Sequence, residues 1–314
     1  MEYTPIRIST VMPKTAITFA LYIYFKDQFI KYLDMGKSLD EELLSKLKKQ
    51  KIARFYIRDI EELNYQKYLD DVLGKTMDDP QVNMVDKINF AEGSATTAVE
   101  DMQKDPTSKQ SYNTSKRAAK TLRRLISENP DSLKNFYGRA GNENDMLIKH
   151  CLNVSALAVG LAKVNAISEE DQDTLALAGL LHDVGISQLK ESEQALFTKE
   201  YKQMSAEEKV IYHQHPTLGS DVIKKNELVT PDIIELVLCH EEKISGNGYP
   251  NKKSKLTLAQ EILSLCNSYD KRVTIFKVSA KDALKAVQMD ELGNYNLELI
   301  NKFKKQLKED GIVV

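Results

Sequence analysis

The chain of 314 residues has no tryptophan, only three cysteines and five histidines, and almost no net charge, at −2. Three cysteines, an odd number, do not build a disulfide framework. A balanced charge argues against binding a nucleic-acid polymer, because that requires a concentrated basic surface. The remaining composition, 42% hydrophobic and 29% charged residues, is typical of a globular protein.

Long apolar runs are also missing from the sequence as it reads. The nearest candidate, residues 16–25, is interrupted by Thr18 and falls short of the ~18 residues expected of a membrane-spanning helix. The N-terminus lacks a basic segment followed by an apolar block and a small-residue cleavage site. We therefore expect a cytoplasmic protein without membrane insertion.

Residues 1–75 predict a small α/β domain. Apolar and other residues alternate over 17–25, a period of two that indicates a strand. A capping box at Ser38–Glu41 precedes a helical run, and residues 51–57 indicate a second strand. No catalytic constellation occurs in this strand–helix–strand unit, so we expect it to regulate the protein or to recruit a signalling protein partner.

The rest of the chain is predicted to be helical, which makes the fold class mainly α. Residues 76–140 begin with a polar stretch and continue with helical spacing, as expected of a helical connector. Residues 141–314 predict an all-helical domain. Its helix starts are marked by Ser168, a capping box at Ser205 and Pro231 after Thr230, and a further helix is predicted over 258–270.

All five histidines lie between His150 and His240. A single histidine is more often a core or surface residue than a ligand. The adjacent pair His182 and Asp183 is stronger evidence, because it ends a helix with an apolar face and should be partly buried. A buried carboxylate must be paired, protonated or bound to a metal. A divalent ion would satisfy the carboxylate and also bind the neighbouring imidazole.

The order of motifs around these histidines resembles a known family. The segment Leu-Leu-His-Asp-Val-Gly at 180–185 resembles the signature of the HD phosphohydrolase superfamily, and Gly-Asn-Gly-Tyr-Pro at 246–250 resembles that of its HD-GYP branch. Three further segments match in order, at 150–154, 215–219 and 258–270. The resemblance covers roughly residues 140–275. Proteins of this branch degrade the second messenger cyclic di-GMP.

The resemblance implies an all-helical HD-type fold around a dinuclear metal centre, with Asp183 as the catalytic, bridging carboxylate. Two divalent ions, iron or else manganese, and a cyclic dinucleotide substrate are expected. Gly248 and Tyr249 are candidate substrate contacts, and Asp270 is a further candidate metal ligand. The implied metal ligands are His150, His182, Asp183, His215, His240, Glu241 and Asn267.

Several positions depart from the family pattern. Ile186 replaces a lysine near the substrate, Glu241 a second histidine, and Asn267 an aspartate ligand. Ser245 replaces the aspartate that opens the Gly-Tyr-Pro loop, and Met146 replaces a glutamate found in three-metal members, so two ions are expected. These changes predict weak or altered activity.

Three functions remain open at this stage. The first is a cyclic di-GMP phosphodiesterase. The second is a degenerate relative that binds metal and signals through protein contacts, and the third is a phosphohydrolase with another phosphate ester as substrate. His213 is expected to lie outside the site, because side chains two residues apart on a helix diverge from each other. Cys151, Cys239 and Cys266 are expected to be buried packing residues behind the site.

Overall fold

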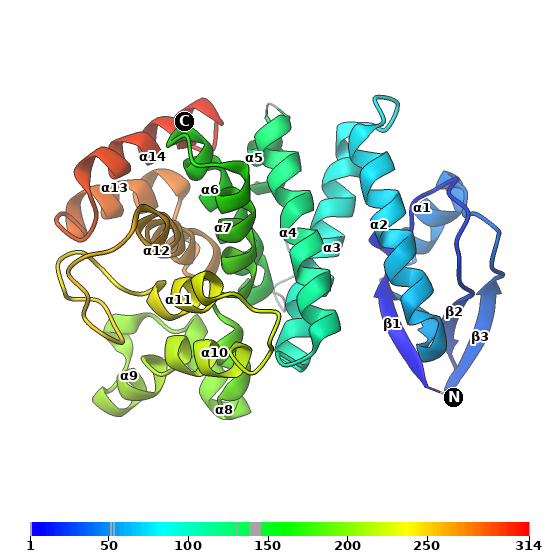
Figure 1. The fold of residues 1–314 in the computed structure, drawn as a ribbon, viewed down its shortest axis with the longest axis horizontal. Coiled ribbons are helices and arrows are strands. Elements are labelled where there is room, and N and C mark those ends of the chain that lie inside the picture. The colour runs from blue at the N-terminus through cyan, green and yellow to red at the C-terminus, as the bar shows by residue number, and fades with distance from the viewer. Residues whose placement is uncertain (1, 51, 53, 130, 138–145, 314) are drawn as a thin grey trace. The chain divides into compact units, whose positions relative to one another are not determined.

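The computed structural model describes residues 2–50, 52, 54–129, 131–137 and 146–313. It divides into two compact units, Met1–Thr97 and Ala98–Val314 (Figure 1). The division falls within helix α3 (Met84–Lys104), further along the chain than residue 75. The separate connector over 76–140 stays a prediction. Residues 51 and 53 of the second predicted strand and 138–145, where the predicted helical domain begins, lie outside the described residues.

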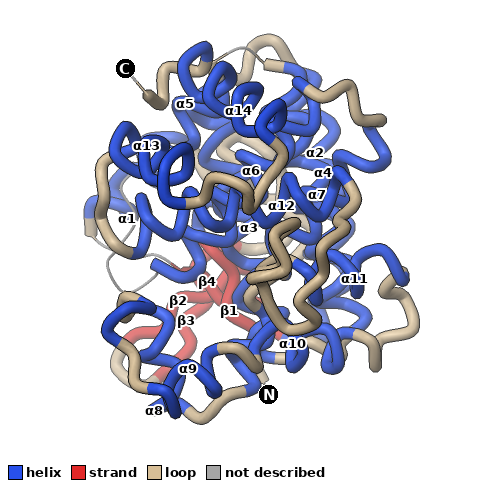
Figure 2. Tube along the Cα trace, turned by 90° about the vertical axis from the view of Figure 1, so that its left-hand side faces the viewer, coloured by secondary structure: helices blue, strands red, loops and turns tan. Residues whose placement is uncertain are grey.

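The first unit contains a four-stranded sheet, drawn in red in Figure 2, in the order β1-β4-β2-β3. Its strands are β1 (Tyr3–Arg7), β2 (Leu21–Phe25), β3 (Gln28–Leu33) and β4 (Arg54–Arg58), and every pairing is antiparallel. The two predicted strands correspond to β2 and β4. The hairpin partner β3 was missed because its turn residues, Lys26 and Asp27, have positive φ without the usual glycine signal.

Besides the first part of α3, the described residues of the first unit include the helices α1 (Glu41–Lys49) and α2 (Glu62–Asp78). The cap of α1 is Asp40 and not Ser38, since the Leu43 amide donates to Asp40 Oδ1 at 2.6 Å. Aromatic rings of α2 pack edge-on against Phe19, with Tyr65 and Tyr68 at 5.4 and 5.3 Å between ring centroids. These side chains share one buried core with the inward residues of the sheet.

The second unit is helical, which confirms the predicted fold class. Its central helix is α6, which packs against α4, α7 and α12. The helices are α4 (Lys109–Glu128), α5 (Ser132–Tyr137), α6 (Met146–Val164), α7 (Glu169–Leu181), α8 (Glu191–Gln194), α9 (Ala206–Tyr212), α10 (His215–Ile223), α11 (Pro231–Cys239), α12 (Leu258–Asp270), α13 (Ala280–Asp290) and α14 (Leu297–Glu309).

Helix α6 corrects the expectation that no segment approaches the length and apolarity of a membrane span. Its 19 residues are long and apolar enough, by composition alone, to cross a membrane. Of its most apolar window, however, 78% is buried inside the protein. The surrounding helices α4, α7 and α12 therefore account for its apolar surface, as for a core helix.

Two helices of the second unit end earlier than the sequence pattern predicts. The predicted starts at Ser168, Ser205 and Pro231 are confirmed, and α12 has the predicted bounds. Helix α7, however, ends at Leu181 and α11 ends at Cys239. The histidines at 182 and 240 therefore lie directly after a helix instead of within one.

Candidate metal centre

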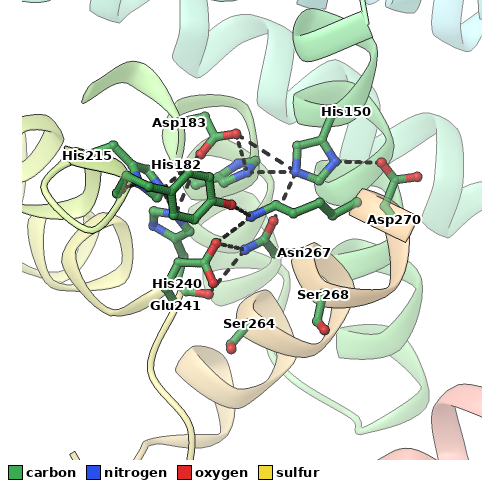
Figure 3. Close-up of polar contacts among 12 residues, drawn as sticks. His150, His182, Asp183, His215, His240, Glu241, Ser264, Asn267, Ser268 and Asp270 are labelled. Atoms are coloured by element: carbon green, nitrogen blue, oxygen red, sulfur yellow. Dashed lines mark hydrogen bonds and ion pairs between the residues drawn. The ribbon is translucent and has the colours of Figure 1, made fainter. Parts of the chain in front are cut away.

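Four histidines and Asp183 converge from separate helices of the second unit (Figure 3). His150 belongs to α6, His215 is the first residue of α10, and the other three residues directly follow α7 and α11. The four imidazoles are fully buried, and Asp183 is 2% exposed. A cluster of this kind needs an internal countercharge, because water cannot solvate it.

The Asp183 carboxylate lies between two pairs of imidazoles. Its Oδ2 is 3.9 Å from His150 Nε2 and 3.4 Å from His182 Nε2. Its Oδ1 is 3.4 Å from His215 Nε2 and 3.6 Å from His240 Nε2. Two groups with metal-ligand geometry thus share Asp183. This is the arrangement expected of a bridging carboxylate, and the role of each residue as a ligand stays a prediction.

Free carbonyls at helix ends orient three of the imidazoles. His182 Nδ1 donates to Gly179 O at 2.8 Å and His240 Nδ1 to Val237 O at 2.7 Å. His215 Nδ1 donates to Tyr212 O, at the end of α9, at 2.6 Å. The last carbonyls of a helix lack partners within it, so each can accept from a side chain. Since a carbonyl only accepts, Nδ1 carries a hydrogen in each ring. In the neutral form of the ring the Nε2 lone pair then faces Asp183, as it would for binding a metal.

The donor set fits divalent cations. His215 Nε2 lies 2.9 Å from His240 Nε2, and His150 Nε2 lies 3.3 Å from His182 Nε2. When each neutral imidazole carries its one hydrogen on Nδ1, both Nε2 atoms are acceptors. Two such Nε2 atoms cannot form a hydrogen bond with each other. Among the described residues, Asp183 Oδ1 also has no hydrogen-bond partner, although it is buried. A cation at each group would satisfy both observations.

Burial and the neighbouring charges set the protonation of this cluster. Burial alone would raise the pKa of the Asp183 carboxyl, but the neighbouring imidazoles, His182 above all, hold that pKa well below its ordinary value. Burial lowers the pKa of His240 to about 4. The carboxylate is therefore ionised and His240 is neutral near pH 7, the forms in which both groups bind metals.

Asp270 lies behind His150 instead of facing the centre of the cluster. Its Oδ2 accepts from His150 Nδ1 at 2.7 Å, and its Oδ1 accepts from Thr274 Oγ1 at 2.9 Å and from Asn153 Nδ2 at 3.2 Å. Both carboxylate oxygens are thus engaged. The geometry favours a positioning role for Asp270, which directs His150 Nε2 inward.

We expect Asp270→Asn to weaken metal binding by roughly 10- to 100-fold while leaving the fold intact, because an amide orients the His150 ring less firmly. Titration with Mn²⁺, monitored by calorimetry, measures this effect. The matched control is Asp221→Asn, which changes an exposed carboxylate on α10 in the same way. Equal affinities for Mn²⁺ in the two variants would contradict a positioning role.

Glu241 and Asn267 lie beside the two groups and contact each other. Asn267 Oδ1 is 2.9 Å from His150 Nε2, and its Nδ2 donates to Glu241 Oε1 at 3.1 Å. Glu241 Oε1 also accepts from Lys271 Nζ at 2.5 Å. Glu241 therefore orients the amide of Asn267, and the amide oxygen Oδ1 lies beside His150 Nε2. Whether either residue binds a metal stays a prediction.

A cavity of about 680 Å³ adjoins the cluster, and it contains residues that the sequence interpretation did not select. His213 stacks between Tyr201 and Tyr249, with ring centroids 5.6 and 4.0 Å away. The sequence predicts His213 on one helix with His215, but it lies in the junction between α9 and α10. Gly248 and Tyr249 both line the cavity, as their candidate role as substrate contacts requires.

No spacing pattern could have found the cavity residues, because they come from distant segments. Tyr201 precedes α9, Tyr249 belongs to the loop between α11 and α12, and Lys271 follows α12. Their meeting depends on how the helices pack.

Ser245, one of the positions that depart from the family pattern, is exposed and donates a hydrogen bond to Asn294 Oδ1 at 2.6 Å.

The three cysteines are buried and free, as predicted. Burial raises the pKa of the Cys239 thiol to about 12, and it holds those of Cys151 and Cys266 well above their ordinary range. Thiols in this state are poor nucleophiles and poor metal ligands near neutral pH.

Comparisons with known proteins agree with this geometry. The family model described as "HD domain" matches residues 116–295, more than half of the chain. A cyclic di-GMP phosphodiesterase of Pseudomonas aeruginosa is 28% identical over 139 residues, which cover 42% of this chain and 31% of that protein. A solved HDGYP protein from Bdellovibrio bacteriovorus has a TM-score of 0.75 and 27% sequence identity, with 98% of this chain and 100% of that chain covered. The matched segment thus spans less than a third of the curated relative.

Proposed function

Because this chain belongs to the HD domain family, we propose that it is an HD-GYP-type, metal-dependent phosphodiesterase that hydrolyses cyclic di-GMP. The observation that carries the proposal is the set of imidazole Nε2 atoms that face Asp183, three of them with their Nδ1 hydrogens bound to carbonyls. The curated relative, a cyclic di-GMP phosphodiesterase, supports the substrate class.

The proposed centre holds two divalent ions that share Asp183. One would be bound by His150 and His182, the other by His215 and His240, which is consistent with the two groups that the structure brings together. Bound divalent ions activate water for attack on phosphorus and neutralise charge on the phosphate oxygens. Imidazole ligands suit iron better than manganese, and the ion pair of Glu241 with Lys271 leaves a set rich in imidazole. We therefore propose iron.

The cavity provides the features that a nucleotide substrate requires. The stacked rings of Tyr201, His213 and Tyr249 form an aromatic surface, and Tyr201 is 41% exposed. Nucleobases stack on such surfaces. Lysine and arginine side chains also line the cavity, which favours the phosphate groups of a dinucleotide over a neutral ligand.

A degenerate signalling module is the alternative, and one observation favours it. The amide of Asn267 contacts His150 at 2.9 Å, where an ionised carboxylate would bind a cation more strongly. A weakly bound ion at this position would lower the rate of hydrolysis and leave the protein folded. In that case the protein would signal through a protein partner.

Turnover of cyclic di-GMP by anaerobically purified protein, loaded in turn with Fe²⁺ and Mn²⁺, tests the proposal. We expect the linear dinucleotide or GMP to form only with metal present, and not to form with His182→Ala. If the wild-type protein binds two ions but forms no product, the phosphodiesterase proposal is overturned and the signalling module is supported.

A further inference from the structure

The ammonium group of Lys271 lies at the boundary between the metal cluster and the cavity. Lys271 follows α12 directly and opens a turn of π-helix over Lys271–Ile275. Such turns are rare and frequently occur at functional sites. Its Nζ donates to Glu241 Oε1 at 2.5 Å and to Tyr212 Oη at 2.8 Å, and its side chain is 14% exposed. The side chain also lines the cavity.

This lysine keeps its charge and has one hydrogen left to donate. Its ammonium group forms an ion pair with the carboxylate of Glu241. An ammonium group has three N–H donors. Two of them bind Glu241 and Tyr212, and no third acceptor is found among the described residues. The third hydrogen is available to an acceptor in the cavity.

Ile186 stands at the position where the family pattern has a lysine, so this position supplies no positive charge to the cavity. Ile186 is 4% exposed and belongs to an apolar cluster with Leu189 and Phe197. Of the other cations that line the cavity, Arg272 and Lys243 are both paired with Glu291. Lys202 and Lys252 also line the cavity, but Lys271 is the lysine that contacts Glu241, beside the cluster.

We propose that Lys271 is a phosphate-binding residue of this site, and that Glu241 is the carboxylate that positions it. The ammonium group donates to a non-bridging oxygen of a phosphate group bound in the cavity beside Asp183. Glu241 holds Lys271 on one side and the amide of Asn267 on the other. The inference rests on the proposed function in that it takes a phosphate ester as the substrate.

Binding measurements test this role separately from turnover. The probes are a phosphorothioate analogue of cyclic di-GMP that resists hydrolysis and inorganic phosphate, both titrated calorimetrically into Mn²⁺-loaded protein. We expect Lys271→Met to raise the Kd for both probes by at least about 10-fold, the effect of losing one charged hydrogen bond. Lys271→Arg should restore most of the affinity, and the metal content should be the same in all three proteins.

A second pair of variants covers the case in which Lys271→Met does not fold because Glu241 is left buried without its counter-ion. Glu241→Gln and the double variant Glu241→Gln/Lys271→Met both lack the carboxylate and differ only in the ammonium group. The double variant should again have higher Kd values than Glu241→Gln, by a smaller factor than in the wild-type background, because the amide oxygen of the glutamine that replaces Glu241 still accepts from the ammonium group but without the charge that positions it. Equal Kd values in these two variants would overturn the role of Lys271.

The results separate this inference from the proposed function. If only inorganic phosphate binds, and its binding depends on Lys271, the phosphate role holds while cyclic di-GMP is the wrong substrate. Unchanged Kd values in Lys271→Met would overturn the role, as would wild-type protein that binds neither probe. A loss of metal that parallels the loss of binding would also overturn it, because Lys271 would then act on the cluster itself.

Discussion

Asp183→Asn should lower metal-dependent hydrolysis of cyclic di-GMP by about 10³-fold or more, a loss of several kcal/mol of stabilisation by metal ions. The change keeps the size of the side chain and removes its charge. Asp183 is the only residue shared by both groups with metal-ligand geometry among the described residues. Its loss should therefore affect both ions, whereas the loss of one histidine affects one group.

The control for this variant is Asp221→Asn, which alters an exposed aspartate of α10 and should leave the rate unchanged. Initial rates are measured at saturating Mn²⁺ for both variants, with circular dichroism to verify the fold. An Asp183→Asn protein within tenfold of the wild-type rate would show that this carboxylate is not at the reacting centre.

Gly185→Ala should destabilise the second unit by roughly 3 kcal/mol or more, because the added methyl group meets backbone and not a flexible side chain. A Cβ atom at this position would lie 2.0 Å from His215 O and 2.6 Å from Gly219 N. Helix α10 would have to move away to admit it. Since His215 is the first residue of α10, the same shift should also weaken metal binding.

Thermal unfolding measures the effect, which should lower the Tm by roughly 6–12 °C for a unit of this size. The control is Gly74→Ala in α2, where a Cβ atom would meet nothing within 4 Å. That substitution should be neutral or stabilising by up to about 1 kcal/mol, as for glycine within an exposed helix. A Gly185→Ala protein as stable as wild type would mean that α10 does not pack this closely on residue 185.

Local signals in the sequence were sufficient to predict much of the helical unit. Capping side chains and proline determine where a helix starts, so the starts near Ser168, Ser205 and Pro231 could be predicted. Helix ends lack such strong signals, and α7 and α11 end one or more residues early. Strand β3 could not be predicted, because four of its six residues are exposed and its turn lacks glycine.

Within the candidate site, the sequence could predict the residues that belong to local motifs, but not the contacts that depend on how the helices pack. The pair His182 and Asp183 is adjacent in sequence, and the other histidines belong to motifs in a recognisable order. The pairing of Glu241 with Lys271 joins the turn after α11 to the π-helical turn after α12, 30 residues further along the chain, and no periodicity marks it. The packing of the helices places that lysine, which looks like a surface residue in the sequence, within the site.

The metal content of the wild-type protein tests the central claim most directly. Mass spectrometry of protein purified anaerobically from iron- and manganese-supplemented cultures should find about two ions per chain, and Asp183→Ala should retain close to none. Wild-type protein without bound metal from every culture, folded and stable, would contradict the account, because the buried imidazoles and carboxylate would then stabilise one another without ions.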